Sequence, residues 1–357
     1  MTVPMAFPLT RGLGAVLGFL FVFTLAAAQA RAATPVAKPP AEVPLAADPP
    51  APARGVMDWL QRMQAASRER SYTGTFVVSA AVGDLSSARI WHACEGSVQL
   101  ERIEALSGPP RSTFRRNDEI LTFLPDVHVV RSEKRDNLAF FPGLTGAPDS
   151  QVGDFYDMRL PGRDRVAGFE ADIVQLVPRD GLRFGYRIWS ERRTGLVVKL
   201  QTTDAAGRAV EQSAFSELQI DVPVNTAALA QMMKPPPDYR VEYSEFERTT
   251  ADAEGWALKK PVPGFRPVSC SRRSMGAAAS RRTVQWTFSD GLASVSLFIE
   301  PYDEQRGAAE RMQSLGATHM LTRRLPERTG PGWWLTVVGE VPPQTLDAFA
   351  QQLVRTR

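Results

Sequence analysis

The sequence predicts an α+β fold, with a large antiparallel sheet and covering helices followed by a smaller α+β domain. Short runs of β-forming residues follow one another, and the turn residues between them leave no room for the helical crossovers of a parallel sheet. Apolar residues recur at helical spacing near both ends of the folded part. The 357 residues, 43% of them hydrophobic, suffice for two domains with cores of their own.

The N-terminus has the layout of a secretory signal peptide. Arg11 precedes the apolar run GLGAVLGFLFVFTLAAA, and the small residues AQA follow at 28–30. We therefore expect residues 1–30 to be removed on export to an oxidising compartment. An uncleaved membrane anchor is the alternative, although the run is short of the ~20 residues that span a bilayer.

The next segment, residues 31–54, is rich in Pro and Ala and poor in large apolar residues, as in ATPVAKPPAEVPLAADPPAPA. Such a composition favours extended conformations and cannot build a core. We expect a disordered tether here.

The large domain is expected over residues 55–225, beginning with a helix that runs into a strand. Trp59, Leu60 and Met63 fall on one helical face, and β-forming residues begin at Tyr72. Roughly ten strands follow, with a second helix between 150 and 158. The first helix must bury its apolar face, so we expect it to lie against the concave side of the sheet and cover an apolar cavity.

A covered apolar cavity suits acyl chains, because burial of apolar surface is non-directional. Phe140 and Phe141, beside Pro142 and Gly143 in an irregular stretch, are the best lid candidates. The alternative for each aromatic residue is an ordinary place in the core. The candidate ligand-binding residues are Trp59, Met63, Trp91, Phe123, Phe140, Phe141, Phe155, Tyr156, Phe184 and Tyr186.

The Pro-containing residues 226–255 are expected to link this domain to a C-terminal domain over 256–357. The run VQWTFSDGLASVSLFIEPY predicts a hairpin around Asp290–Gly291. The final stretch PPQTLDAFAQQLVRTR predicts a helix with Pro in its first turn.

No motif predicts catalysis: GxSxG, HExxH, P-loop and GxGxxG patterns are all absent from the sequence. Two Cys and three scattered His have no metal-ligand spacing, so we expect neither a metal nor a cofactor. The Asp-Gly pairs of RDG (179–181) and SDG (289–291) are typical of turns. The net charge of +3 is too small to argue for nucleic acid as a partner. A binding protein is therefore favoured over an enzyme.

Two further features leave alternatives open. Cys94 and Cys270 are the only cysteines, and an oxidising compartment permits a disulfide between them, or two free thiols. Four pairs of adjacent arginines suit phosphates or an acidic partner, or else form solvated charged faces. They are Arg115–Arg116, Arg192–Arg193, Arg272–Arg273 and Arg323–Arg324.

The stretch WLQRMQAASRERSYTGTFVV (59–78) resembles the start of the mature RseB/MucB family of periplasmic regulators of the sigma-E envelope-stress response. The resemblance continues in order through residues 155–212, WALKKPVPGF (256–265), SRRS (271–274), FSDGLASVSLFIEP (288–301) and VVGEVPPQT (337–345). It covers about 300 residues. The tether at 33–53 is longer than is usual in the family, and the two cysteines are not a family feature.

The resemblance implies a large N-terminal domain similar to the lipoprotein carriers LolA and LolB, which is an unclosed β-barrel. It also implies that the protein binds the periplasmic segment of a single-pass anti-sigma factor of the RseA/MucA type. Binding would protect that segment from cleavage by the site-1 protease. Release by a lipid such as lipopolysaccharide, and a homodimer, are further expectations. A lipid or lipoprotein carrier is the rival hypothesis. The expected partner-binding residues are Arg272, Arg273, Trp286, Phe288 and Phe298.

Overall fold

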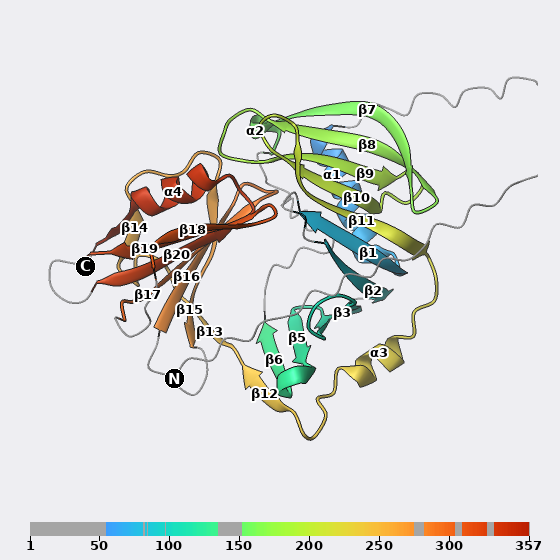
Figure 1. Cartoon of the computed structure of the whole chain (residues 1–357), viewed down its shortest axis with the longest axis horizontal. Coiled ribbons are helices and arrows are strands. Elements are labelled where there is room, and N and C mark those ends of the chain that lie inside the picture. The colour runs from blue at the N-terminus through green and yellow to red at the C-terminus, as the bar shows by residue number, and fades with distance from the viewer. Residues whose placement is uncertain are drawn as a thin grey trace, which may run out of the picture. The chain divides into compact units, whose positions relative to one another are not determined.

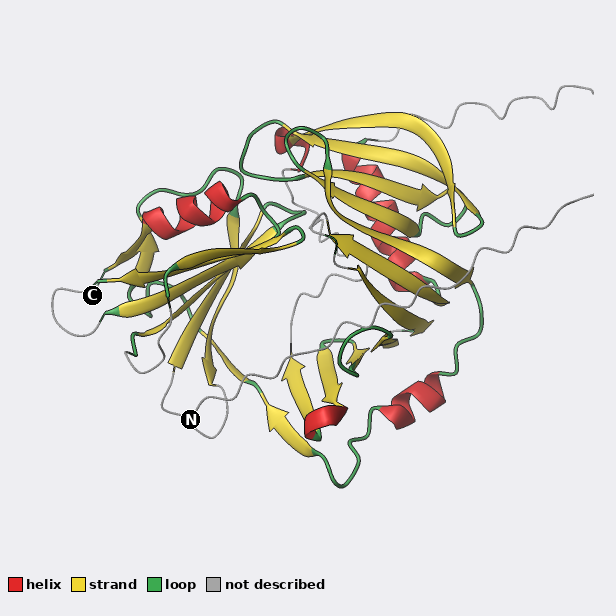
Figure 2. Ribbon diagram, viewed as in Figure 1, coloured by secondary structure: helices red, strands yellow, loops and turns green. Residues whose placement is uncertain are grey.

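The structure is a computed structural model of the whole chain (Figure 1). It describes residues 55–356, with gaps at 81–82, 84, 97, 135–151, 275–281, 304–308 and 327–331. The expected signal peptide and tether therefore lie outside the described residues. Strands predominate over helices in the part that is described (Figure 2).

The larger of the two main sheets, the large sheet, has 12 strands in the order β12-β6-β5-β4-β3-β2-β1-β11-β10-β9-β8-β7. All neighbours are antiparallel except β12 and β6, and the end strands β12 and β7 do not pair with each other. The prediction of a large, unclosed antiparallel sheet is thus confirmed. Its strands are β1 (Tyr72–Ala80), β2 (Leu85–Glu95), β3 (Val98–Ala105), β4 (Ser112–Arg116), β5 (Glu119–Leu124), β6 (Val129–Lys134), β7 (Tyr156–Val166), β8 (Phe169–Pro178), β9 (Gly185–Glu191), β10 (Val197–Thr203), β11 (Ala209–Ile220) and β12 (Arg240–Tyr243).

Helix α1 (Val56–Glu69) lies against this sheet, as the hydrophobic period predicts. The carboxylate of Asp58 accepts the backbone N–H of Gly55 at 2.9 Å, which fixes the first turn. Trp59, Leu60 and Met63 are buried among apolar side chains of β8, β9 and β10. The helix ends at Glu69, and the extended backbone of its C-cap Arg70 leads through Ser71 into β1.

The segment expected as an interdomain linker is itself structured. It holds helix α3 (Thr226–Met232), whose N-terminus is capped by Asn225, and then two consecutive strands. The first, β12, pairs in parallel with β6 at the edge of the large sheet. The second, β13 (Glu245–Arg248), pairs with β15 in the other main sheet. Only Ser244 separates these two strands.

The second main sheet, the small sheet, has seven strands in the order β13-β15-β16-β17-β20-β19-β18. Its hairpin β16–β17 confirms the prediction made from SDG, with Gly291 at φ 100° in the turn. The remaining strands and helices are β15 (Arg266–Ser274), β16 (Arg282–Ser289), β17 (Ser294–Pro301), β18 (Arg311–Leu315), β19 (Thr318–Leu325), β20 (Trp333–Gly339), α2 (Val152–Phe155), the 3₁₀ turn η1 (Pro125–Val127) and α4 (Pro343–Gln352).

Helix α4 packs on the small sheet and begins with Pro343 in its first turn, as predicted. It ends at Gln352, inside the stretch that predicts it. Leu353 would continue the apolar face of Leu346, Phe349 and Ala350, but it opens the short strand β21 (Leu353–Arg355), which pairs with β14 (Trp256–Leu258). Pairing with another segment of chain outweighs the local helical pattern here.

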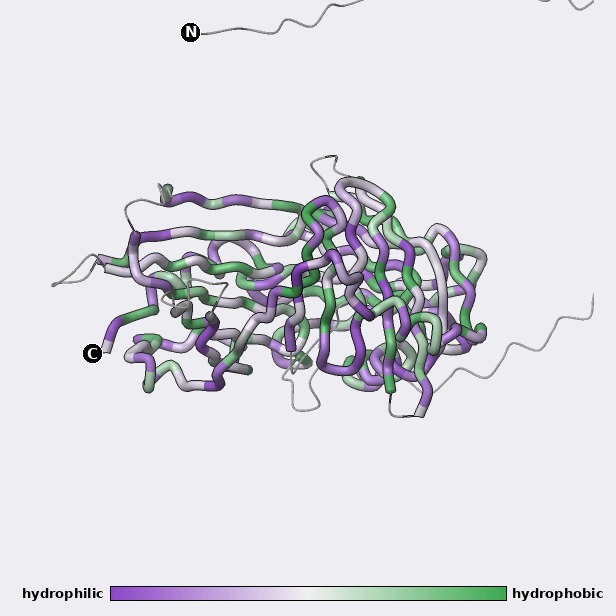
Figure 3. The backbone as a smooth tube through the Cα atoms, turned by 90° about the horizontal axis from the view of Figure 1, so that it is seen from below, coloured by the Kyte–Doolittle hydropathy of each residue, from purple (hydrophilic) through white to green (hydrophobic). Residues whose placement is uncertain are grey.

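Each main sheet has apolar cores of its own. One cluster of buried residues joins α4 to the small sheet, and three others lie on the large sheet. The alternation of hydrophobic and hydrophilic positions that produces these cores can be followed along the strands in Figure 3. None of the described helices is long and apolar enough to cross a membrane.

Candidate functional site

Seven of the ten predicted ligand-binding residues lie in or against two buried apolar clusters. Trp59 and Met63 of α1 join Tyr156 and Tyr186 in one buried cluster, with Phe155 packed against it. Phe123 is buried in a second cluster against which Trp91 packs. Phe184 is also buried, with its ring 5.9 Å from that of His319. Phe140 and Phe141, the lid candidates, lie outside the described residues.

The predicted partner-binding residues differ in accessibility. Phe288 is a core residue, only 3% exposed and 4.9 Å from the ring of Phe349. Trp286 lies beside it and is half-buried. Phe298 alternates with the buried residues Leu297 and Ile299 on β17 and is therefore on the face opposite to α4.

The arginine pairs have intramolecular carboxylate partners. Arg272 pairs with Glu247 at 2.8 Å and also with Glu254, and Arg273 lies 3.8 Å from the carboxylate of Glu133. Arg115 pairs with Glu101 of its own sheet, and Arg323 pairs with Asp347 of α4. These charges contribute to packing as well as to any surface that an acidic partner would meet.

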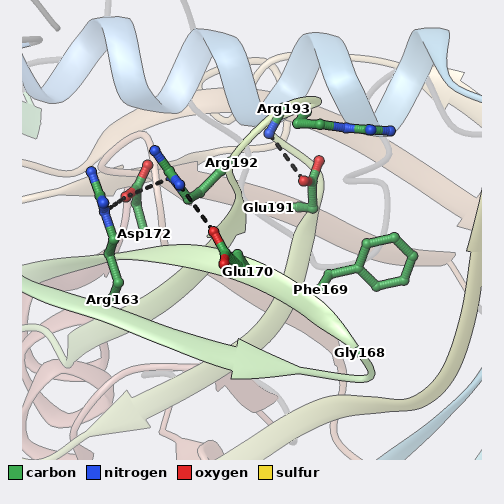
Figure 4. A pocket seen from close by; sticks show the side chains of 8 residues that line it. All are labelled: Arg163, Gly168, Phe169, Glu170, Asp172, Glu191, Arg192 and Arg193. Carbon is green, nitrogen blue, oxygen red and sulfur yellow. Dashed lines mark hydrogen bonds and ion pairs between the residues drawn. The ribbon is translucent and has the colours of Figure 1, made fainter. Parts of the chain in front are cut away.

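A surface hollow of about 570 Å³ lies around Arg192 (Figure 4). Arg192 pairs with Glu170 at 2.9 Å, and Asp172 accepts a hydrogen bond from Arg163 at 3.2 Å. Its lining is mostly charged and these charges pair with one another, so it differs from the apolar cavity expected. The lining residues are Arg163, Gly168, Phe169, Glu170, Asp172, Glu191, Arg192 and Arg193.

Both cysteines are free thiols in the structure. Cys94 lies in β2 of the large sheet and Cys270 in β15 of the small sheet, so the disulfide that the sequence permits is not formed. Burial, helped by the nearby carboxylate of Glu254, raises the pKa of the Cys270 thiol to about 11. This thiol therefore stays protonated and is a weak nucleophile. In the described part of the chain, no group of His, Cys, Asp or Glu is arranged to hold a metal ion.

The two main sheets meet at a buried polar joint centred on Arg183, between β8 and β9. The side chain of Arg183 is fully buried. Its Nη2 donates to the carbonyl of Pro263 at 2.8 Å, and its Nε donates to Asp180 at 3.1 Å. Its guanidinium also lies 4.2 Å from the centre of the Phe155 ring. A cation on an aromatic face is a favourable contact when it is desolvated.

Asp290, in the β16–β17 turn, is the anion of the joint. Its Oδ1 accepts the backbone N–H groups of Leu292 and Ala293, at 2.9 and 2.7 Å. Its Oδ2 accepts the hydroxyl of Tyr156 at 3.3 Å and lies 3.4 Å from Nη1 of Arg183. One oxygen thus shapes the turn of the small sheet, and the other reaches the large-sheet residues.

The joint also exchanges apolar side chains. Leu292, from the small-sheet turn, belongs to the buried cluster beneath α1, and Leu182, from the large-sheet turn, packs against the small-sheet core. Thr345 of α4 donates to the carbonyl of Leu182 at 2.6 Å. Gly264 has φ +79°, and a Cβ there would come within 2.7 Å of the Arg183 guanidinium. A side chain at Gly264 would therefore exclude Arg183 from its place.

The charges at the joint are desolvated. Burial raises the pKa of the Asp290 carboxyl, while the N–H groups of Leu292 and Ala293 and the charge of Arg183 offset part of that rise. Burial also raises the pKa of Tyr156 and Tyr186 well above the usual value, so both hydroxyls stay neutral.

Sequence reasoning identified RDG and SDG as turns, which is correct, but not as partners in this joint. Each Asp is explained locally by its own turn, so nothing in the local pattern distinguishes it. One feature of the sequence could have indicated the joint. Arg183 is a charged residue between Leu182 and Phe184, in the largely apolar run LRFGYRIW. A charge in such a position requires a buried counter-charge.

A second buried ion cluster lies within the large sheet. Glu101 of β3 accepts from Arg115 of β4 at 3.4 Å and lies 3.3 Å from the His92 ring of β2. The other ring nitrogen of His92 lies 3.4 Å from the carbonyl of Arg68 in α1. The ring of Tyr72 stacks on His92 at 5.0 Å. This cluster therefore ties the end of α1 to four neighbouring strands, β1 to β4.

Comparison with known proteins places both parts of the chain in one family. Residues 55–233 match the MucB/RseB N-terminal domain and residues 250–354 match the MucB/RseB C-terminal domain. The sigma factor AlgU regulatory protein MucB of Pseudomonas aeruginosa is 32% identical over 317 residues, which cover 86% of this chain and 93% of that protein. The sigma-E factor regulatory protein RseB of Escherichia coli is 27% identical over 306 residues, or 85% of this chain and 91% of that protein.

Solved structures agree with the sequence comparison. MucB in complex with MucA(peri) superposes with a TM-score of 0.63 at 28% identity, covering 85% of this chain and 100% of that one. The Pseudomonas aeruginosa MucA/MucB complex gives a TM-score of 0.64 at 28% identity, covering 84% of this chain and 98% of that one. With both domains matched in order along the sequence and in three dimensions, the chain belongs to the MucB/RseB family.

Proposed function

We propose that this protein is a periplasmic regulator that binds the periplasmic segment of a single-pass membrane anti-sigma factor. By covering that segment it would hinder site-1 proteolysis and keep an envelope-stress sigma factor inactive. The observation that carries the proposal is the likeness, over nearly the whole folded chain, to MucB in complex with MucA(peri). Binding and not catalysis is the proposed activity, in line with the regulatory names of the relatives.

The periplasm is the proposed location, because the signal-peptide pattern of residues 1–30 directs export. The C-terminal domain match favours a regulator over a lipoprotein carrier, since a carrier needs only the sheet and its covering helix. Lipid-prompted release is part of the proposal. Trp59 and Met63 are 5% and 1% exposed, so an acyl chain would have to displace α1 or rearrange the side chains beneath it.

Phe298 is the proposed partner-binding residue with the best geometry. It is half-buried on the small-sheet face that α4 leaves uncovered, where its loss removes contact area without opening a core cavity. Phe288, in contrast, is a core residue, and its truncation should cost about 3–5 kcal/mol of folding stability.

The test is binding of the purified mature chain to the periplasmic segment of an anti-sigma factor of the RseA/MucA type from the same organism, by calorimetry and by protection from site-1 cleavage. We expect binding and slower cleavage, both weakened by Phe298→Ala and unchanged by Leu106→Ala, which truncates an exposed loop residue. Added lipopolysaccharide should release the segment. A chain that neither binds the segment nor slows its cleavage would overturn the proposal.

A further inference from the structure

The joint between the two main sheets combines few apolar contacts with a buried ion pair. Opening it would expose Leu182, Phe184 and Leu292. It would also break a few polar contacts, such as the bonds from Thr345 to Leu182 and from Ala317 to Glu211. In return, Asp290 and Arg183 would regain water. The cost of removing the two charges from water offsets much of their Coulomb attraction. Separating both partners into water therefore costs far less free energy than that attraction alone would require.

We propose that Tyr156, Arg183 and Asp290 form a reversible latch, which closes the C-terminal domain onto the N-terminal domain and opens without unfolding either. The covalent hinge is the one-residue connection at Ser244, between β12 and β13. These strands are edge strands of their sheets, and β7 and β18 are the opposite edges. A hinge of a few residues between packed bodies is the usual basis of domain closure.

The two oxygens of Asp290 give the latch its specificity. Oδ1 is engaged within its own turn, so the turn keeps its shape when the latch opens. Oδ2 is the atom that meets Tyr156 and Arg183. Asp290→Asn keeps an acceptor oxygen for the turn, and its amide then faces the guanidinium as a second donor. This substitution therefore breaks the latch selectively.

Arg183→Gln breaks the latch from the other side. It removes the charge opposite Asp290 and the bond to the carbonyl of Pro263. Arg179→Gln is the matched control, because Arg179 lies in the same turn but pairs with Asp157 of β7, within the N-terminal domain. A structural disturbance of the turn would appear in both arginine variants, whereas loss of the latch appears only in Arg183→Gln.

The experiment measures the distance between spin labels on Leu160→Cys of β7 and Met312→Cys of β18, in a background of Cys94→Ser and Cys270→Ser. Both label sites are exposed and lie on the edge strands farthest, in strand order, from the hinge. Circular dichroism confirms that each variant is folded. If Arg183→Gln fails to fold, Asp290→Asn decides the question.

We expect one main distance in the parent protein and a longer, broader population in Asp290→Asn and Arg183→Gln. Removing one partner of a buried pair should raise the open-to-closed ratio by roughly 200-fold or more. Arg179→Gln should keep the parent distribution. Folded Asp290→Asn and Arg183→Gln proteins that keep the parent distance would overturn the latch, whether or not the chain binds an anti-sigma segment.

Discussion

Two buried ion clusters in this protein use the same chemistry at different levels of the fold. Glu101 meets Arg115 and His92 on three adjacent strands, and the residues are 14 and 9 positions apart in the chain. Asp290 meets Tyr156 across 134 positions and Arg183 beside it. Hairpin register alone brings the first cluster together, whereas the second forms only when the two domains dock.

The two clusters differ in what they stabilise: one stabilises the fold of a sheet, and the other the orientation of one domain relative to the other. The Glu101 cluster is closed wherever β2, β3 and β4 pair, so it can open only when that part of the large sheet unfolds. The Asp290 cluster can open while both sheets keep their pairing. The buried charges around Glu101 therefore stabilise the fold of the large sheet. In our proposal, those around Asp290 hold the two domains in one relative position.

Glu101→Ala should cause the largest loss in the free energy of unfolding. It leaves Arg115 buried without its carboxylate, and breaking one side of a buried pair costs about 3–5 kcal/mol. Denaturant unfolding followed by circular dichroism measures the loss. Glu104→Ala, which removes a more exposed pair with Arg102 on the same strand, should cost less than about 1 kcal/mol. Equal losses in the two variants would mean that burial does not set the value of the Glu101 cluster.

Asp290→Ala and Asp290→Asn should differ in the stability of the small sheet. Both lose the latch, but Ala also leaves the buried N–H groups of Leu292 and Ala293 without an acceptor. Each unsatisfied group costs about 1–3 kcal/mol, so unfolding of the small sheet should occur at lower denaturant in the Ala variant. Tryptophan fluorescence reports that unfolding, since four of the seven Trp residues, at 256, 286, 333 and 334, lie in the C-terminal domain. Identical midpoints would show that Oδ1 does not hold the turn.

The Asp290 carboxyl also makes the latch sensitive to pH. Its pKa is raised in the closed joint, where Arg183, Tyr156 and Tyr186 face it, so the closed state holds the proton more tightly than the open state. Proton binding therefore favours closure. A protonated carboxyl keeps acceptor capacity on both oxygens, whereas the amide nitrogen of Asn has none and faces the Arg183 guanidinium as a donor, so the two neutral groups act in opposite directions. The contribution is complete below the usual Asp pKa of about 4 and is lost as the pH rises through the raised value.

The label distance between β7 and β18 should consequently shift toward the open population from about pH 4 to neutral pH. Asp290→Asn, which cannot titrate there, should give a distribution that does not change over the same range. Opening on acidification instead would mean that the attraction of Arg183 outweighs desolvation at this site.

Local patterns predicted much of this fold. The apolar face of α1, the SDG hairpin and the Pro at the start of α4 each follow from residues near one another in sequence. The end of α4 did not, because Leu353 pairs with Leu258 almost a hundred positions away. The joint escaped prediction for the same reason: the two Asp-Gly turns are complete as turns, and only the tertiary structure brings Asp290 to Arg183.

Arg192→Gln should cause the smallest loss in the free energy of unfolding. It tests an exposed ion pair beside the two buried ones. Arg192 pairs with Glu170 at 2.9 Å, a shorter distance than either buried pair shows, yet the Glu170 side chain is 72% exposed. Water and salt screen such a pair, so we expect a loss of less than about 1 kcal/mol that shrinks further at high salt. Denaturant unfolding at two salt concentrations, beside Arg183→Gln, makes the comparison. If Arg192→Gln cost as much as Arg183→Gln, contact distance and not burial would determine what an arginine contributes in this protein.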